Sequence, residues 1–212
     1  MTETITNAGA GPARPAPRWA GVLQGTLTRI RDDPAALAAC RRGVGKHPFD
    51  VPAMWPYLAP ALDAIPEAQT GRRAIEVACH HALALYATHQ QSRPEPMHVR
   101  EPGGRRDSLG RACRQLSAAL ERKRRSAEGV TRRFLAAATA DSVGELIGHL
   151  RGLIPQLREH RIPLDYVQLA QDLAAWHRPD RRAWVRRRWG LDFYRREAPG
   201  TDQHEENVDG LA

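Results

Sequence analysis

Cysteine, lysine and long apolar runs are scarce in this 212-residue sequence. The three cysteines, Cys40, Cys79 and Cys113, are widely spaced and form no CxxC pair, which argues against a disulfide framework or a zinc site and suits a reducing compartment. No apolar run approaches the roughly 20 residues that cross a bilayer. The opening MTETITNAGAGPARPAP also lacks the apolar region of a secretory signal. We therefore expect a cytoplasmic protein.

Motifs for catalysis and cofactor binding are lacking as well. No glycine-rich phosphate loop follows a strand, and no GKS or GKT triplet occurs. Cys79–His81 is a run of adjacent residues on a predicted helix, where neighbouring side chains point 100° apart. These residues are therefore better explained as ordinary core and surface residues than as ligands of one metal ion. Asp141, Glu145 and His149 likewise point in different directions and do not form a paired-carboxylate motif. We expect no enzyme activity, no metal and no cofactor.

Positive charge is abundant and unevenly distributed. The formal net charge is +8, and 30 of the 32 basic residues are arginines, whose planar fork suits phosphate binding. A GC-rich genome would also enrich arginine, so composition alone does not identify a nucleic-acid partner. Residues 93–133 carry a net charge of +7 and residues 178–196 a net charge of +6, whereas the segment from 197 onward has five acidic and no basic residues. Such concentrated patches are typical of contact with phosphate backbones.

The hydrophobic pattern predicts an all-α fold. Apolar residues recur at helical spacing, and no period-2 alternation is long enough for a strand. We expect a multi-helix bundle of two small helical lobes, at residues 18–90 and 108–196, joined by a flexible loop at 91–107. Residues 1–17 are expected to be a disordered N-terminal segment and residues 197–212 an acidic tail.

Several helix ends are marked by capping signals. Asp33 precedes Pro34 at the start of a short helix, and Asp107 or Ser108 opens another. Ser142 and Glu145 form a capping box, and Thr70 is expected to cap the long helix that follows it.

The stretch ERKRRSAEGVTRRF, residues 121–134, holds six basic side chains in fourteen positions. It spans the end of one predicted helix and the start of the next. Helical geometry allows basic residues of both helices to share one surface, and like charges so close together are unfavourable unless a polyanion lies there. A solvated charged face is the alternative.

A second basic stretch, AWVRRRWGLDFY at 183–194, places three arginines between Trp184 and Trp189. Aromatic rings beside arginines serve either as stacking platforms for unpaired bases or as core and interface anchors. We favour anchors, because Trp184 and Leu191 fall on one helix face.

Ordered blocks of sequence carry a family resemblance. LAACRRG (37–43), ALYATHQQ (84–91), SLGRACRQL (108–116), RRFLAAATAD (132–141), HLRGLI (149–154), PLDYVQLAQDLAAW (163–176) and WVRRRWGLDFY (184–194) together resemble the CasB family. CasB is the small subunit of Cascade, the type I-E CRISPR surveillance complex.

The resemblance implies a non-enzymatic subunit that sits as a pair of copies beside the subunits carrying the CRISPR RNA. There it would help to hold the target strand paired to the guide RNA, and the displaced strand, through backbone contacts. The basic positions that match the family blocks, and are expected to contact phosphates, are Arg41, Arg42, Arg111, Arg132, Arg133 and Arg151. Charge geometry alone adds Arg114, Lys123 and Arg124.

Two classes of function therefore remain open at the level of sequence. The first is an antiviral ribonucleoprotein subunit that binds CRISPR RNA and the target and non-target DNA backbones. The second is a helical scaffold whose basic and aromatic surfaces bind partner proteins instead.

Overall fold

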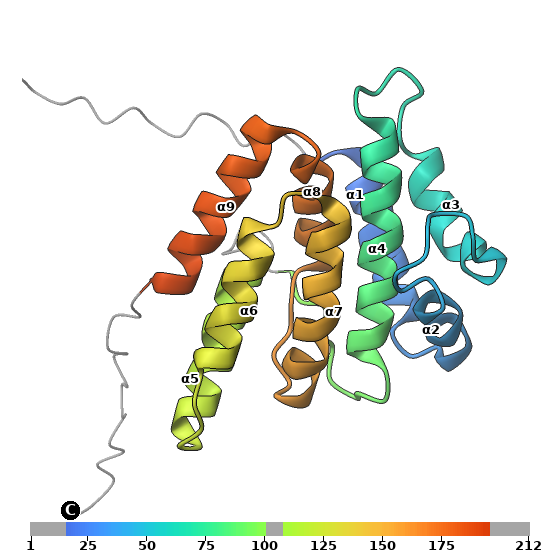
Figure 1. Cartoon of the computed structure of the whole chain (residues 1–212). Coiled ribbons are helices and arrows are strands. Elements are labelled where there is room, and N and C mark those ends of the chain that lie inside the picture. Colours follow the sequence, from blue (N-terminus) through green and yellow to red (C-terminus); the bar gives the residue numbers. More distant parts are fainter. Residues whose placement is uncertain (1–15, 101–107, 196–212) are drawn as a thin grey trace, which may run out of the picture.

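The computed structural model describes residues 16–100 and 108–195, and within these ranges the chain is helical (Figure 1). The elements in chain order are α1 (Arg18–Ile30), α2 (Pro34–Arg41), η1 (Pro52–Met54), α3 (Trp55–Asp63), α4 (Arg72–Gln90), α5 (Leu109–Arg122), α6 (Glu128–Thr139), α7 (Val143–Glu159), α8 (Tyr166–Trp176) and α9 (Pro179–Tyr194). The expected all-α class is confirmed. The only strand-like pairing in the described ranges is an isolated bridge between His98 and Leu164.

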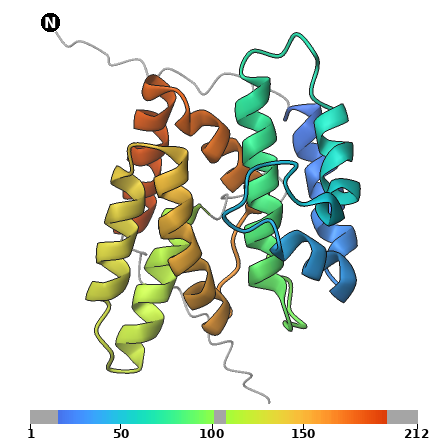
Figure 2. The same ribbon diagram turned by 45° about the vertical axis from the view of Figure 1, so that its right-hand side comes forward.

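Helix α4 runs through the middle of the molecule (Figures 1 and 2). It packs against α2 and α3 on one side and against α7 and α8 on the other, and most of its side chains are buried. Buried side chains from α1 to α9 form one continuous cluster. The division into two lobes stays a prediction. The predicted N-terminal segment lies outside the described residues except for residues 16–17, and the predicted acidic tail lies entirely outside them.

A buried aromatic network joins α4 to α8 and to the segment after α4. The Tyr166 hydroxyl lies 3.0 Å from Nδ1 of His89, and the Tyr166 amide donates to Nδ1 of His98 at 3.1 Å. His98 Nε2 in turn contacts Gln24 Oε1 of α1 at 2.7 Å. Residues 91–97 are further held by the side-chain amide of Gln90, which donates to the Arg93 and Glu95 carbonyls. Residues 101–107 of the predicted loop lie outside the described residues.

The predicted caps at Asp33 and Ser142 are confirmed, and of the two candidates Asp107 and Ser108 it is Ser108 that caps α5. Each side chain accepts hydrogen bonds from backbone amides of the first turn of its helix. The capping box differs in one detail, because Glu145 accepts from the amide of Asp141 rather than that of Ser142. The Thr70 cap is wrong: α4 starts at Arg72 after Gly71, whose φ of 77° is a left-handed conformation suited to glycine, and no side chain caps it.

The cysteines are buried and unbridged, as the sequence predicted. Burial raises the pKa of the Cys40, Cys79 and Cys113 thiols to about 12, so all three are protonated at neutral pH. Their role here is to fill the core.

Candidate nucleic-acid interface

The arginines of α9 are largely occupied by contacts within the chain. Arg186 donates to the carbonyls of Thr139 and Ala140, at 2.9 and 2.7 Å, and Arg182 donates to the carbonyl of Asp141. These carbonyls end α6, where a cation is favoured by the helix dipole. Arg188 pairs with the buried Asp172 of α8. The strong positive charge of residues 178–196 therefore serves the fold to a large extent, which the sequence did not reveal.

A first group of unpaired cations lies where α7 meets the turn after α2. Arg42, Lys46 and Arg151 are exposed, and none has an acidic partner among the described residues. The guanidinium of Arg151 lies against Gly45, since a Cβ at Gly45 would be 3.0 Å from its Nη1. We call Arg42, Lys46 and Arg151 the α2–α7 cation group.

The local backbone explains how this group forms. Gly45 has a φ of 73°, which lets the chain turn tightly and leaves space for Arg151. His80 of α4 contacts the start of this turn, because its Nε2 lies 3.0 Å from the Gly43 carbonyl oxygen. Burial lowers the pKa of His80, so it stays neutral in this position.

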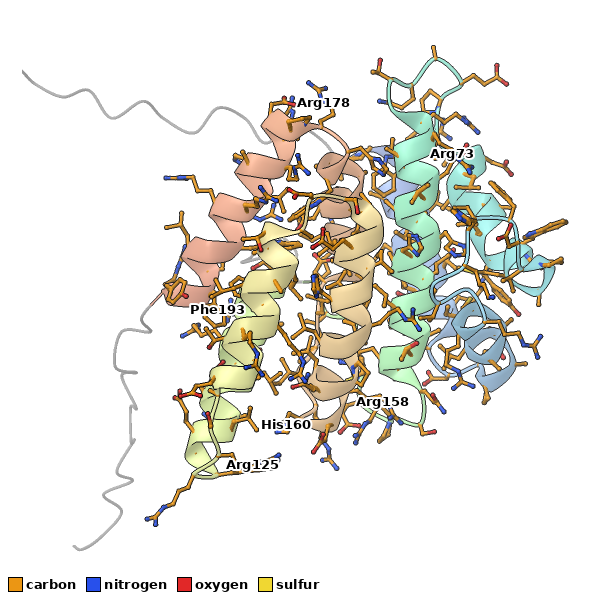
Figure 3. The ribbon with its side chains drawn as sticks, in the orientation of Figure 1. Arg73, Arg125, Arg158, His160, Arg178 and Phe193 are labelled. Atoms are coloured by element: carbon orange, nitrogen blue, oxygen red, sulfur yellow. The ribbon has the colours of Figure 1, made fainter. Side chains whose placement is uncertain are left out.

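A second group of basic residues lies where α5 ends, α6 begins and α7 ends. Arg125, Arg133 and His160 line one small pocket there. Figure 3 shows Arg125 and His160 at the same end of the molecule, with Arg158 on the side toward α4. We call Arg125 and Arg133 the α5–α7 cation group, and His160 lines the same pocket.

Other predicted phosphate contacts face elsewhere. Arg41 lines a cavity of about 550 Å³ between α2 and residues 90–94, together with Arg31 and Arg93. Arg132 lines a shallow pocket with Glu121 and Leu135.

The remaining predicted positions lie along α5. Arg111 and Arg114 are half-buried and engaged in contacts, whereas Lys123 and Arg124 are exposed at the end of the helix. The structure therefore brings Arg151 against the turn that follows Arg42, and it places Arg133 in a different pocket from Arg132. Whether any of these residues contacts phosphate stays a prediction.

The aromatic residues of α9 divide into two sets. Trp189 and Phe193 are buried, with Phe193 stacked on Phe134 at 4.3 Å and Trp189 on Trp176 at 5.2 Å. On the outer face Trp184, Leu191 and Tyr194 are 57%, 51% and 64% exposed. Trp184 and Leu191 share a face as predicted, but they are surface residues and do not anchor this chain's core.

The acidic and histidine side chains near α7 have structural contacts. Glu145 lies 3.6 Å from Nε2 of His149 and accepts from the amide of Asp141. The Asp141 carboxylate is 3.8 Å from Arg186. Within the described ranges, no cluster of three or more His, Cys, Asp or Glu residues is arranged to hold a metal ion. None of the described helices is long and apolar enough to span a bilayer.

Comparison with known proteins identifies the family. A family model described as CRISPR-associated protein Cse2 matches residues 36–194. This chain belongs to the Cse2 family. The resemblance to CasB inferred from the sequence is thereby confirmed.

Solved structures agree with this assignment. CasB from Thermobifida fusca is 31% identical, with a TM-score of 0.65 over 84% of this chain and 96% of that one. A Cse2 family protein from Thermus thermophilus is 25% identical, with a TM-score of 0.61 over 82% of this chain and 97% of that one. A chain of a CRISPR RNA-guided surveillance complex is 27% identical, with a TM-score of 0.62 over 82% of this chain and 92% of that one. No curated protein matches.

Proposed function

We propose that this Cse2 family member is a non-enzymatic subunit of a type I-E CRISPR Cascade complex. It would bind the sugar–phosphate backbones of the guide RNA–target DNA heteroduplex and of the displaced strand, beside other subunits and a second copy of itself. Family membership and the likeness to a chain of an RNA-guided surveillance complex support this role.

The observation that carries the proposal is the α2–α7 cation group. Arg151 lies against Gly45, in the turn that carries Arg42 and Lys46 about a hundred residues earlier in the sequence. None of the three is paired with a carboxylate of the described residues. Exposed like charges repel one another, and a phosphate backbone relieves that repulsion. Arginine and lysine on such a surface hold the backbone irrespective of base sequence, while base pairing with a guide reads the sequence.

The test compares salt dependence of single-strand binding by the full chain. Each phosphate contact contributes about 0.7 to the slope of log affinity against log salt, so Arg42→Gln combined with Arg151→Gln should lower the slope by about 1.4. Arg29→Gln combined with Arg187→Gln changes the net charge equally at exposed arginines outside both cation groups, and should leave the slope almost unchanged. Equal effects of the two double variants would contradict the proposal.

A second candidate function is a protein scaffold, favoured by the exposed side chains of Trp184, Leu191 and Tyr194 on α9. Large exposed apolar residues in one region are typical of protein-binding surfaces. Retention of this subunit by its partners after complete nuclease treatment, lost on Leu191→Ser but not on Arg42→Gln with Arg151→Gln, would favour the scaffold. Release by nuclease would favour the nucleic-acid role.

A further inference from the structure

The ends of three helices enclose the pocket of about 180 Å³ that the α5–α7 cation group lines. Its floor is apolar and formed by Leu116, Leu120 and Val130, and its rim is polar. The polar and small lining residues are Arg125, Ser126, Gly129, Arg133, Gln156, Glu159 and His160.

Two helix ends of the same kind shape this pocket. At the end of α5, Arg124 adopts a φ of 54°, and the amide of Arg125 returns to the Leu120 carbonyl at 3.0 Å. At the end of α7, Arg161 adopts a φ of 56°, and the amide of Ile162 returns to the Leu157 carbonyl at 3.0 Å in the same way. These left-handed turns fix the backbone at Arg125 and His160, so both side chains start from rigid positions.

The rim of the pocket is positively charged. The Arg133 guanidinium lies over the first turn of α6, because a Cβ at Gly129 would be 3.5 Å from its Nη1. Arg125 and Arg133 have no carboxylate partner among the described residues. The single acidic residue of the lining, Glu159, is exposed to solvent. The start of α6 adds the favourable end of a helix dipole for an anion.

His160 supplies the strongest indication of a ligand. Both of its ring nitrogens are buried, and neither has a hydrogen-bond partner within the described residues. Buried polar atoms in folded proteins are nearly always hydrogen-bonded, because leaving one unpaired is costly. Among the other buried histidines of the described residues, His98 is bonded through both ring nitrogens, whereas His80 and His89 are each bonded through one and leave the other unpaired. A group with acceptor oxygens in the pocket would accept the ring N–H of His160.

We propose that this pocket binds one phosphate group, held by Arg125, Arg133 and His160. A phosphate offers several acceptor oxygens and a negative charge, and two guanidiniums with an imidazole match both. The phosphate comes either from a nucleic-acid backbone, in which case the inference rests on the proposed function, or from a free nucleotide. The apolar floor accommodates the sugar or base attached to it.

The experiment titrates the full chain with inorganic phosphate while the ring resonances of its histidines are followed by NMR. The His160 resonances should shift with phosphate and not with chloride at equal ionic strength. Arg133→Gln should weaken phosphate binding by about tenfold or more, since a charge-assisted hydrogen bond is lost. His160→Gln should weaken it by a smaller factor. Matched controls are Arg187→Gln, an exposed arginine of α9, and His177→Gln, a histidine that ends α8 as His160 ends α7. Both controls should bind phosphate like the parent chain.

Equal losses in Arg133→Gln and Arg187→Gln, or an identical response to chloride, would overturn the site. Thermal unfolding of every variant checks that the helices remain folded.

A second arm separates the two sources of phosphate. A short deoxyoligonucleotide that competes with inorganic phosphate at His160 identifies the backbone as the ligand, whereas competition by a mononucleotide alone identifies a nucleotide site. If the chain binds single strands but its pocket does not bind phosphate, only the proposal of the phosphate pocket is contradicted. If the pocket binds phosphate but the chain shows no salt-dependent binding of single strands, only the proposed function is contradicted.

Discussion

Arg124 and Arg161 occupy backbone positions where glycine is usually found. Each lies just past the end of a helix in the left-handed region, with φ of 54° and 56°. That conformation costs a residue with a side chain about 1 kcal/mol relative to glycine. Arg161 recovers part of this cost by pairing with Glu95 at 3.0 Å, whereas Arg124 has no such partner among the described residues. The charge of Arg124 is thus kept at some expense of stability, as expected for a residue that serves binding.

Replacing Arg124 by glycine should therefore separate stability from binding. We expect Arg124→Gly to raise the free energy of unfolding by about 0.5–1 kcal/mol, because the strained backbone is relieved. It should also weaken single-strand binding through the lost charge. Arg122→Gly, inside the last turn of α5, should instead lower stability by about 1 kcal/mol. Urea unfolding and strand titration of both variants measure these effects, and a destabilised Arg124→Gly variant would refute the interpretation.

Helix α9 is attached to the rest of the molecule by polar contacts as well as by apolar ones. Asp172 of α8 is buried, and its carboxylate accepts from Trp189 Nε1 at 2.8 Å, from Gln168 Nε2 at 2.8 Å and from Arg188. Burial raises the pKa of Asp172, while Arg188 and the hydrogen bonds oppose that rise. On the α5 side, a Cβ at Gly110 would lie 2.0 Å from the Trp189 carbonyl, so only glycine permits the close packing of α5 and α9.

The contacts of the Asp172 carboxylate predict how strongly its removal weakens the attachment of α9. Asp172→Ala leaves Arg188 and the Trp189 indole without their acceptor, and should lower the free energy of unfolding by about 3–5 kcal/mol. Asp180→Ala removes a carboxylate of α9 that pairs with Arg178 and Arg181 in solvent, and should change the free energy of unfolding far less, because exposed ion pairs contribute little to stability. Urea unfolding followed by tryptophan fluorescence compares the two. Similar losses would show that Asp172 is not the main polar attachment of α9.

At the scale of the whole molecule, histidines buried in the core make the free energy of unfolding depend on pH. His89 of α4 is buried beside Tyr166 of α8, and burial, with Arg158 and Arg93 nearby, lowers its pKa to about 3. Burial also lowers the pKa of His81 on the same helix to about 4. In the unfolded chain both histidines take up a proton at about pH 6.5. Below that pH the unfolded state binds more protons than the folded state, so stability falls with acidification.

We expect the free energy of unfolding to decrease by up to about 1.4 kcal/mol per pH unit for His89 alone between about pH 5.5 and about pH 4. Stability attributable to this residue is fully present above about pH 6.5. Urea unfolding at several pH values tests this dependence. His89→Gln cannot be protonated and should give a shallower slope; an unchanged slope would place the acid sensitivity elsewhere.

The sequence determined the all-α class, the caps at Asp33 and Ser142, and the family, because helical periodicity, capping and ordered motifs are local features. It also located the basic stretches. Local spacing says which face of its own helix an arginine occupies, but not which other segment meets that face.

Only the tertiary structure decided which cations are available for binding. Arg186 is tied to the end of α6 more than 40 residues away, whereas Arg151 meets the turn after α2 across a still longer separation. His160 is distinguished by the pocket that three helix ends form around it. The burial and charge that a side chain experiences depend on neighbours distant in sequence, and these are fixed only when the helices pack.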